Sequence, residues 1–263
     1  MAIKPRVFVT VRNTRRPQKA KSPYIDGCFE AMGVMGSVYI NSQIPSSSGL
    51  GSSAAVTVAT LSAINDEFSL HKTREEIADM AFEIEKTVQK GRASPTDTTV
   101  SSYGGIVLIS GGSRRRLPPQ NIHLVIGDSL VSHSTSKMVE LVSELKMKHP
   151  SIVDPVLDAI EGVSMSAIHH LNNPKELGRY MNMNHALLEV LGVGHPQLGK
   201  MVLAARAAGA FGAKITGAGG GGCMVALCPK PIKHRIANAI EACDARAIIT
   251  GIDTEGARKE KNV

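Results

Sequence analysis

The sequence predicts an α+β fold, because strand-like and helix-like segments mix in both halves of the chain without the strict alternation of a doubly wound sheet. Strands are expected where apolar and β-branched residues alternate, and helices where apolar residues recur at helical spacing. The expected strands are Val7–Arg12, Ser37–Ile44, Ile106–Ile109, Ile122–Ile126, Ala213–Thr216, Cys223–Cys228 and Arg246–Thr250. The expected helices are Ser52–Phe68, two that open at Thr73 and Ser94, Ser134–Lys148, Ile152–Leu171, Pro174–Leu191, His195–Ala208 and Lys233–Cys243.

Two of these helices begin at clear capping signals. Thr73 and Glu76 have the spacing of a capping box. Ser94 is a good N-cap residue, and the proline after it suits the first helical position. The basic, proline-containing stretch Ser110–Gln120 predicts a flexible link, and we place the domain boundary beside it, between residues 1–112 and 113–263. A chain of 263 residues is long enough for two domains of this size.

Composition narrows the classes of partner. The chain carries a formal net charge of +7, but apart from Arg12–Lys21 and Arg114–Arg116 its basic residues are scattered. Only 3% of the residues are aromatic, so stacking platforms for nucleic acid are scarce, and we expect no nucleic-acid partner. An anionic nucleotide and an anionic substrate account for the charge equally well.

No apolar run approaches the roughly 18–20 residues of a membrane span, and the first residues contain no apolar signal core. We therefore expect a cytoplasmic protein without a membrane partner. Cys28 and Cys243 show no zinc-type spacing with the other two cysteines. Cys223 and Cys228 lie in an apolar run, where buried thiols are expected.

A glycine- and serine-rich loop between an expected strand and an expected helix is the first candidate site. Its residues are Pro45, Ser46, Ser47, Ser48, Gly49, Leu50, Gly51, Ser52, Ser53, Ala54 and Ala55. Glycines let the backbone approach a ligand, and the free amides at the start of the helix favour an anion, so the loop predicts phosphate binding. A serine hydroxyl could also reach Mg²⁺. The alternative is a serine-rich connector that only caps the helix. The pattern of a Walker A loop is absent.

Asp97 lies in the first turn of the helix that opens at Ser94. The helix N-terminus would keep its carboxylate ionised, and a free oxygen could accept the proton of a substrate hydroxyl. The alternative is that Asp97 only completes the cap.

A second glycine loop connects two expected strands near the end of the chain. Its candidate residues are Thr216, Gly217, Ala218, Gly219 and Gly220, and five of the six residues from Gly217 to Gly222 are glycine. Because glycine loses much conformational entropy on folding, this density predicts a close backbone approach to something. The loop enters a strand rather than a helix, which excludes a dinucleotide-binding fingerprint.

The stretch from Pro45 to Ala55 resembles the ATP-phosphate motif of the GHMP kinases. The segment Arg92–Thr98 resembles the catalytic aspartate loop of that family, and Lys214–Cys223 its third motif. The blocks Met181–Val193 and Ala204–Ala210 are similar to helices of its archaeal mevalonate kinase branch. The resemblance covers the chain from about Ser37 onward.

The resemblance implies a GHMP kinase fold, with an N-terminal ribosomal-protein-S5-domain-2-like domain and a C-terminal ferredoxin-like domain. It implies ATP and Mg²⁺, a metal site at Ser53 and Glu85, and Asp97 as the base. The segment Gln89–Gly91 is one residue longer than the family pattern, so Glu83 stays open as the alternative to Glu85. The implied reaction phosphorylates the primary hydroxyl of mevalonate to give 5-phosphomevalonate, and the implied assembly is a homodimer.

The first motif of the family, a Pro-Gly-Lys segment followed by a Gly-Glu-His segment, has no counterpart here. We therefore expect the N-terminal domain to be truncated at its start and Met1 to be an internal methionine. The missing lysine would remove a preorganised charge, so we expect this chain to phosphorylate mevalonate poorly. Two alternatives stay open: another acceptor on the same fold (phosphomevalonate, shikimate or homoserine), and a catalytically impaired nucleotide-binding module.

Overall fold

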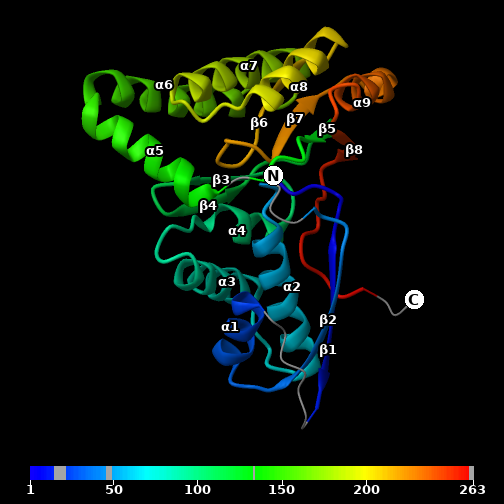
Figure 1. Ribbon diagram of the computed structural model, residues 1–263. Helices are drawn as coiled ribbons and strands as arrows, with labels where there is room; N and C mark the ends of the chain where they lie inside the picture. The colour runs from blue at the N-terminus through cyan, green and yellow to red at the C-terminus, as the bar shows by residue number, and fades with distance from the viewer. Residues whose placement is uncertain (15–21, 46–48, 133, 261–263) are drawn as a thin grey trace. The chain divides into compact units, whose positions relative to one another are not determined.

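The computed structural model describes residues 1–14, 22–45, 49–132 and 134–260, which divide into two compact units (Figure 1). Of these residues, the first unit contains 1–14, 22–45, 51–119 and 252–260. The second contains 49–50, 120–132 and 134–251. Each unit is therefore assembled from segments that are distant in the sequence.

In its described residues the first unit has a two-stranded antiparallel sheet, four helices and a two-stranded hairpin. Its elements are β1 (Val7–Asn13), α1 (Pro23–Met32), β2 (Gly36–Ser42), α2 (Ser52–Glu67), α3 (Arg74–Val88), α4 (Pro95–Tyr103), β3 (Val107–Ser110) and β4 (Ser113–Arg116). β1 pairs with β2, with Val9 opposite Ile40. One apolar core joins β1 to α1, α2 and α3, and its fully buried members include Cys28, Leu61 and Ile64. The predicted capping box at Thr73 is confirmed.

Helix α1 was not predicted. It begins with Pro23 after the N-cap Ser22 and ends at Gly33, whose φ of +64° is the left-handed conformation that glycine adopts easily. Ile25 and Cys28 are its buried residues. The start and stop signals were both present in the sequence, but a helix of ten residues shows few apolar positions from which to recognise its period.

The prediction of a flexible link at Ser110–Gln120 was wrong for its first part. Ser113–Arg116 forms β4 and pairs with β3 through the two-residue turn Gly111-Gly112. Both glycines have positive φ, 54° and 79°, as the common tight hairpin turn requires. Arg114 forms an ion pair with Asp79, 2.6 Å between Nη1 and Oδ1. Arg114, one of the basic residues that suggested a flexible link, therefore connects the hairpin to α3.

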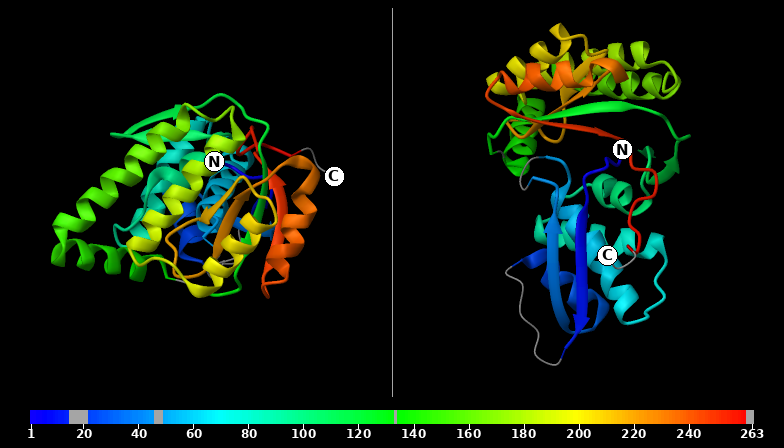
Figure 2. Two further views of the ribbon diagram at one scale, coloured as in Figure 1. Left: turned by 90° about the horizontal axis from the view of Figure 1, so that it is seen from above. Right: turned by 90° about the vertical axis from the view of Figure 1, so that its right-hand side faces the viewer.

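The second unit contains a four-stranded antiparallel sheet. Its elements are β5 (His123–Asp128), α5 (Thr135–Lys148), α6 (Pro150–Ile168), α7 (Pro174–Val190), α8 (Pro196–Ala207), β6 (Gly212–Ile215), β7 (Cys223–Leu227), the short 3₁₀ helix η1 (Lys230–Ile232), α9 (Lys233–Glu241) and β8 (Arg246–Gly251). The strand order β6-β7-β5-β8 and the alternation of strands and helices are those of a ferredoxin-like unit. α8 and α9 cover one face of the sheet and form the core with it (Figure 2).

The end of the chain belongs to the first unit. Ile252 forms a bridge with Ile3, Asp253 pairs with Arg6, and the Ala257 N–H donates to the Ser101 carbonyl at 2.9 Å. The last segment thereby ties β1 to the C-terminal half of α4. Among the helices of the described residues, none has the combined length and hydropathy that crossing a bilayer needs. All four cysteines are buried, as expected for Cys223 and Cys228.

Candidate active site

The first glycine loop ends where α2 begins. Gly49 and Gly51 have φ of +73° and +68°, so both positions favour glycine. Gly51 is the N-cap of α2 and supplies no side-chain cap. Pro45, Leu50 and Ala55 are half-buried. The predicted residues Ser46, Ser47 and Ser48 lie outside the described residues.

The first turn of α2 presents free backbone donors. Within the described part of the chain, the amides of Ser52, Ser53 and Ala54 have no hydrogen-bond acceptor. The next amide, that of Ala55, bonds the Gly51 carbonyl at 2.9 Å as the helix requires. Ala54 is fully buried, so the helix start packs tightly. Because free amides and the positive end of the helix dipole coincide here, this turn is suited to hold an anion such as a phosphate.

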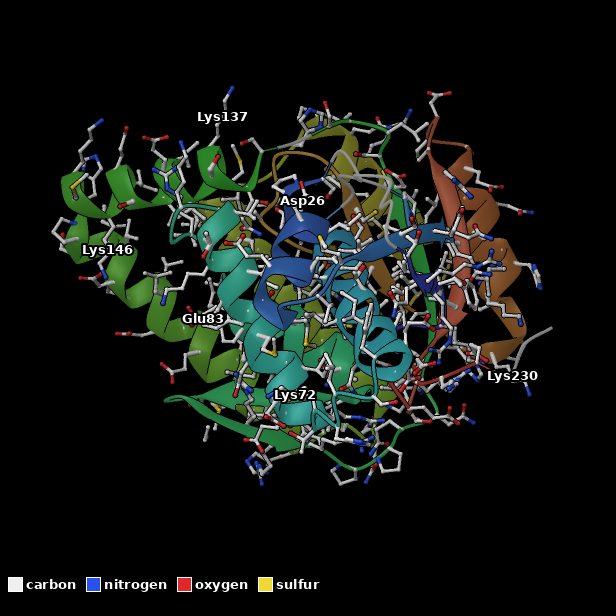
Figure 3. All side chains as sticks on the ribbon, turned by 90° about the horizontal axis from the view of Figure 1, so that it is seen from below. Asp26, Lys72, Glu83, Lys137, Lys146 and Lys230 are labelled. Atoms are coloured by element: carbon white, nitrogen blue, oxygen red, sulfur yellow. The ribbon has the colours of Figure 1, made fainter. Side chains whose placement is uncertain are left out.

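Ser53 and Glu85 lie in contact. The Ser53 hydroxyl donates to Glu85 Oε1 at 2.6 Å, although the two residues are 32 positions apart. Glu85 is only 4% exposed, and this burial raises the pKa of its carboxyl, while the Ser53 hydrogen bond lowers it and the nearby Asp97 raises it further. Glu83 faces solvent instead, with a side chain 65% exposed and paired with Lys86 (Figure 3). Of the two candidates, the structure brings Glu85 to Ser53.

Asp97 lies in the first turn of α4, which Ser94 caps by accepting a hydrogen bond from the Thr96 amide. Its carboxylate lies against Gly51: a β-carbon built on Gly51 would come within 3.1 Å of Asp97 Cγ. Desolvation by the surrounding protein raises the pKa of Asp97, and the Met1 α-ammonium group opposes that rise. The residue nevertheless keeps an exposed surface. Asp97 therefore lies beside the free amides of α2 while staying open to a ligand.

In the second glycine loop, between β6 and β7, some of the backbone amides donate to carbonyl groups elsewhere in the second unit. The Gly220 amide donates to the Val193 carbonyl and the Gly222 amide to the Val131 carbonyl, both at 2.8 Å. A β-carbon on Gly219 would collide with the Val193 carbonyl. No pattern in the sequence indicated these two valine carbonyls, which lie on connecting segments. Part of the glycine content therefore serves packing.

The tip of this loop is different. Gly217 lies against Gly49, and a β-carbon on Gly217 would be 3.1 Å from the Gly49 carbonyl oxygen. Within the described residues, the amides of Gly217, Ala218 and Gly219 have no acceptor. The Thr216 amide closes the strand pair by donating to the Cys223 carbonyl at 3.1 Å. The tip of the second loop therefore lies against Gly49, within the second unit, and has open donors.

The side chains around the start of α2 are hard oxygen donors: the Ser53 hydroxyl and the carboxylates of Glu85 and Asp97. Mg²⁺ prefers such donors and is commonly held by one or two carboxylates together with substrate phosphates. Among the described residues, no group of three or more His, Cys, Asp or Glu side chains is placed so that it could hold a metal ion. The donor set therefore fits Mg²⁺ accompanied by a phosphate ligand.

A helix start with free amides beside an accessible carboxylate is an arrangement that ATP-dependent small-molecule kinases can use. The family profile of the GHMP kinases N terminal domain matches residues 22–105, and that of the GHMP kinases C terminal domain matches residues 164–245. The chain belongs to the GHMP kinase family.

Individual relatives narrow the comparison. The chain is 41% identical over 232 residues to the mevalonate kinase of Pyrococcus abyssi, a match that covers 86% of this chain and 69% of that protein. The crystal structure of the Methanococcus jannaschii mevalonate kinase is similar with a TM-score of 0.73 and 28% identity, over 88% of this chain and 74% of that one. The L. major mevalonate kinase in complex with R-mevalonate shares the fold with a TM-score of 0.82 and 24% identity, over 97% of this chain and 87% of that one.

Proposed function

We propose that this protein transfers the γ-phosphoryl group of Mg·ATP to the primary hydroxyl of (R)-mevalonate, giving 5-phosphomevalonate. The observation that carries the proposal is the meeting of Ser53, Glu85 and Asp97 at the free amide end of α2. The identity of about 40% with archaeal mevalonate kinases supports the choice of acceptor.

In this proposal the first turn of α2 holds the phosphates of ATP. The amides of Ser52, Ser53 and Ala54 donate to phosphate oxygens, and the helix dipole favours their negative charge. The family resemblance implies that the second glycine loop also approaches the phosphates, and within the described residues the amides of Gly217 and Ala218 have no acceptor, so they can serve as further donors. Since the transition state of phosphoryl transfer is loose, positioning and charge neutralisation by such groups supply most of the acceleration.

Ser53 and Glu85 would hold Mg²⁺, which when bound neutralises charge on the transferring phosphate. Asp97 accepts or orients the proton of the substrate hydroxyl. The desolvation that raises the pKa of Asp97 also makes it a stronger base for that proton once it is ionised. The contact between Asp97 and Gly51 fixes the carboxylate next to the phosphate-binding turn.

The proposal is tested by Asp97→Asn, which keeps the shape of the side chain and removes its basicity. We expect turnover to fall by at least about 10²-fold, since a positioned general base contributes about 10²–10⁴-fold. ATP affinity measured by calorimetry should change little. Turnover is followed with labelled ATP at high protein concentration, so that low rates are also quantified. Glu83→Gln removes an exposed carboxylate from the same unit and is the matched control. Retained turnover in Asp97→Asn would refute the assignment of the base.

A substrate panel tests the acceptor. Mevalonate, phosphomevalonate, shikimate and homoserine are offered at equal concentration, and mevalonate should give the highest kcat/KM. A homodimer and a cytoplasmic location are carried over from the resemblance and from composition, and stay predictions. Light scattering of the purified protein tests the first, and cell fractionation tests the second.

A further inference from the structure

The outer edge of β6 in the second unit is bonded by side chains instead of by a neighbouring strand. Among the strands of the described residues, β6 pairs with β7 alone, so the backbone groups of Ala213 and Ile215 point away from the sheet. An open edge of this kind normally needs a neighbouring strand or a cover. Here side chains supply the cover. The Ala213 amide donates to Asn182 Oδ1 at 3.0 Å, and the Ala213 carbonyl accepts from Arg206 Nη2 at 2.7 Å. The Ile215 carbonyl accepts from Lys214 Nζ, also at 2.7 Å.

Helix α7 lies directly on this strand. A β-carbon on Gly178 would collide with the backbone of Phe211, and a β-carbon on Gly212 would collide with the backbone of Gly178. Glycine at both positions therefore lets helix and strand touch backbone to backbone. Asn182 follows Gly178 by one helical turn, so its amide side chain reaches the strand edge from the same face of α7.

The same helix also reaches the far side of the second glycine loop. The segment just after α7 contains Val193, whose carbonyl accepts the Gly220 amide at 2.8 Å. β6 leads into the loop at Thr216, only three residues beyond Ala213. The loop is therefore held at its root by Asn182 and Arg206 and beyond its tip by the segment that comes after α7.

A buried histidine lies near Arg206 and Lys214. His185, one turn beyond Asn182, is 3% exposed; its Nε2 lies 3.5 Å from Glu189 Oε1, and its Nδ1 has no partner in the described part of the chain. Burial lowers the pKa of His185, Glu189 raises it, and Arg206 and Lys214 lower it further. The strand carbonyls of Ala213 and Ile215 are the acceptors that Arg206 and Lys214 use. Asn182, Arg206 and Lys214 thus all form hydrogen bonds with backbone groups of β6.

We propose that Asn182 and Arg206 are positioning residues for the second glycine loop, which they place by clamping the open edge of β6. The proposal rests on the proposed function, in which the loop amides meet the phosphates of ATP. The two side chains touch backbone and act through the loop. A displacement of the loop by about 1 Å can cost up to about 10²-fold in rate.

The test compares Asn182→Leu, which has nearly the same shape but no acceptor, with Asn182→Asp, which keeps an oxygen at the acceptor position. Asn182→Leu should lower kcat/KM for ATP by about 10-fold or more, and Asn182→Asp should recover most of that loss. Amide hydrogen exchange measured by mass spectrometry should quicken in a peptide spanning residues 216–222 of Asn182→Leu, while peptides from α9 should be unchanged. Arg206→Met should act in the same direction.

Arg235→Met is the matched control. Arg235 Nε donates to the Ala208 carbonyl at 2.9 Å, so this variant also removes an arginine-to-carbonyl hydrogen bond next to α8, but one that does not touch β6. It should leave both the kinetics and the loop exchange unchanged. The proposal would be overturned if Asn182→Leu had the same stability in urea as Arg235→Met and left both kcat/KM and the amide exchange of the loop unaltered. Failure of the proposed function would be visible separately, as an Asp97→Asn variant that retains turnover.

Discussion

The two glycine loops of this protein use glycine for different purposes. In the first, Gly51 caps a helix whose opening amides are free, and its backbone lies against the carboxylate of Asp97. In the second, which joins two strands, Gly219 is packed against the Val193 carbonyl and the Gly220 amide donates to that carbonyl, while within the described residues the amides of Gly217, Ala218 and Gly219 have no acceptor. The difference arises from the element that each loop enters. A helix start concentrates free amides, whereas a strand uses most of its amides in the sheet.

Glycine density is therefore a poor guide to chemistry on its own. The longer run of glycines belongs to the loop that needs them mainly for its own packing. The shorter run, with only Gly49 and Gly51, belongs to the place where a hydroxyl and two carboxylates meet. If this comparison is right, adding a methyl group should damage catalysis in the first loop and stability in the second.

Gly51→Ala tests the first half and carries the largest expected effect. Its β-carbon would crowd Asp97 Cγ at 3.1 Å, and its φ of +68° adds about 1–2 kcal/mol of backbone strain. Because the carboxylate and the proposed phosphate-binding turn of α2 would both shift, we expect kcat/KM to fall by about 10²-fold.

The control for Gly51→Ala is Gly33→Ala in the same unit. Gly33 has nearly the same φ, +64°, but a β-carbon there meets nothing within 4 Å. This variant should cost a similar amount of stability in urea unfolding and leave kcat/KM unchanged. Equal kinetic losses in the two variants would show that strain alone, and not the contact with Asp97, explains the effect.

Gly219→Ala tests the second half. The added methyl group would collide with the Val193 carbonyl at a φ of +81°, and we expect the free energy of unfolding of the second unit to fall by about 3 kcal/mol. Gly192→Ala is matched in strain, with φ of +75°, but its β-carbon would make only an ordinary contact with Leu141 at 3.6 Å. That control should lose about 1–2 kcal/mol in urea unfolding. A Gly219→Ala variant that unfolds like Gly192→Ala would contradict the packing role.

Most of the fold could be predicted from the sequence because its elements are long or well capped. α2, α3 and α7 have between 15 and 17 residues, which gives the helical period room to show. α1 was missed because its ten residues offer too few apolar positions to show a helical period. The end signals at Ser22 and Gly33 were not sufficient to identify a helix. β4 was missed because its four residues are Ser-Arg-Arg-Arg, which is not a strand composition; pairing with β3 and the ion pair to Asp79 override it.

The site shows the same division. The glycines before α2 and the acid in the first turn of α4 were predicted as site residues from local motifs, and their roles stay predictions. Contacts between distant segments have no local motif. The approach of Glu85 to Ser53 spans 32 positions and was predicted only through the family resemblance, which left Glu83 open. The choice between Glu85 and Glu83 depends on which face of α3 packs on α2. The clamp on β6 joins α7 and α8 to a strand edge and has no sequence pattern of its own.

Glu85→Gln probes the buried carboxylate next to the first loop. Burial raises the pKa of Glu85, so the folded protein keeps this proton to a higher pH than the unfolded chain does. Stability from this group is thus fully present below its unfolded pKa of about 4.5 and is lost as pH rises through the raised value. Glu85→Gln cannot lose that stability, so without ligand it should be the more stable protein at neutral pH in urea unfolding.

The same variant should lose stabilisation by Mg·ATP, which for the wild type amounts to about 1.4 kcal/mol at ten times the dissociation constant. Thermal unfolding with and without the ligand measures this difference. Glu83→Gln, at an exposed position of the same helix, should change neither result. A Glu85→Gln variant that Mg·ATP stabilises as much as the wild type would exclude Glu85 from the metal site.

Lys214, at the root of the second loop, should change the free energy of unfolding with pH in the direction opposite to Glu85. This is the smallest of the predicted effects. Burial lowers the pKa of Lys214 to about 8, below its ordinary value of 10.5. Between these two values the unfolded chain binds more protons than the folded protein, so the free energy of unfolding should rise with pH across that window. One group can contribute at most about 1.4 kcal/mol per pH unit. Lys214→Met should remove this rise, as measured by urea unfolding between pH 7.5 and about 10.5.

Lys200→Met is the control for Lys214, because Lys200 is exposed and in the same unit, paired with Asp244 at 3.5 Å. It should keep the alkaline rise. If both comparisons hold, the contribution of Glu85, beside the first loop, to the free energy of unfolding falls as pH rises through its raised pKa. The contribution of Lys214, at the root of the second loop, rises as pH rises from about 8 to 10.5. A flat alkaline profile in the wild type would mean that the Lys214 ammonium group is solvated, and its hydrogen bond to the Ile215 carbonyl would then contribute little to holding β6.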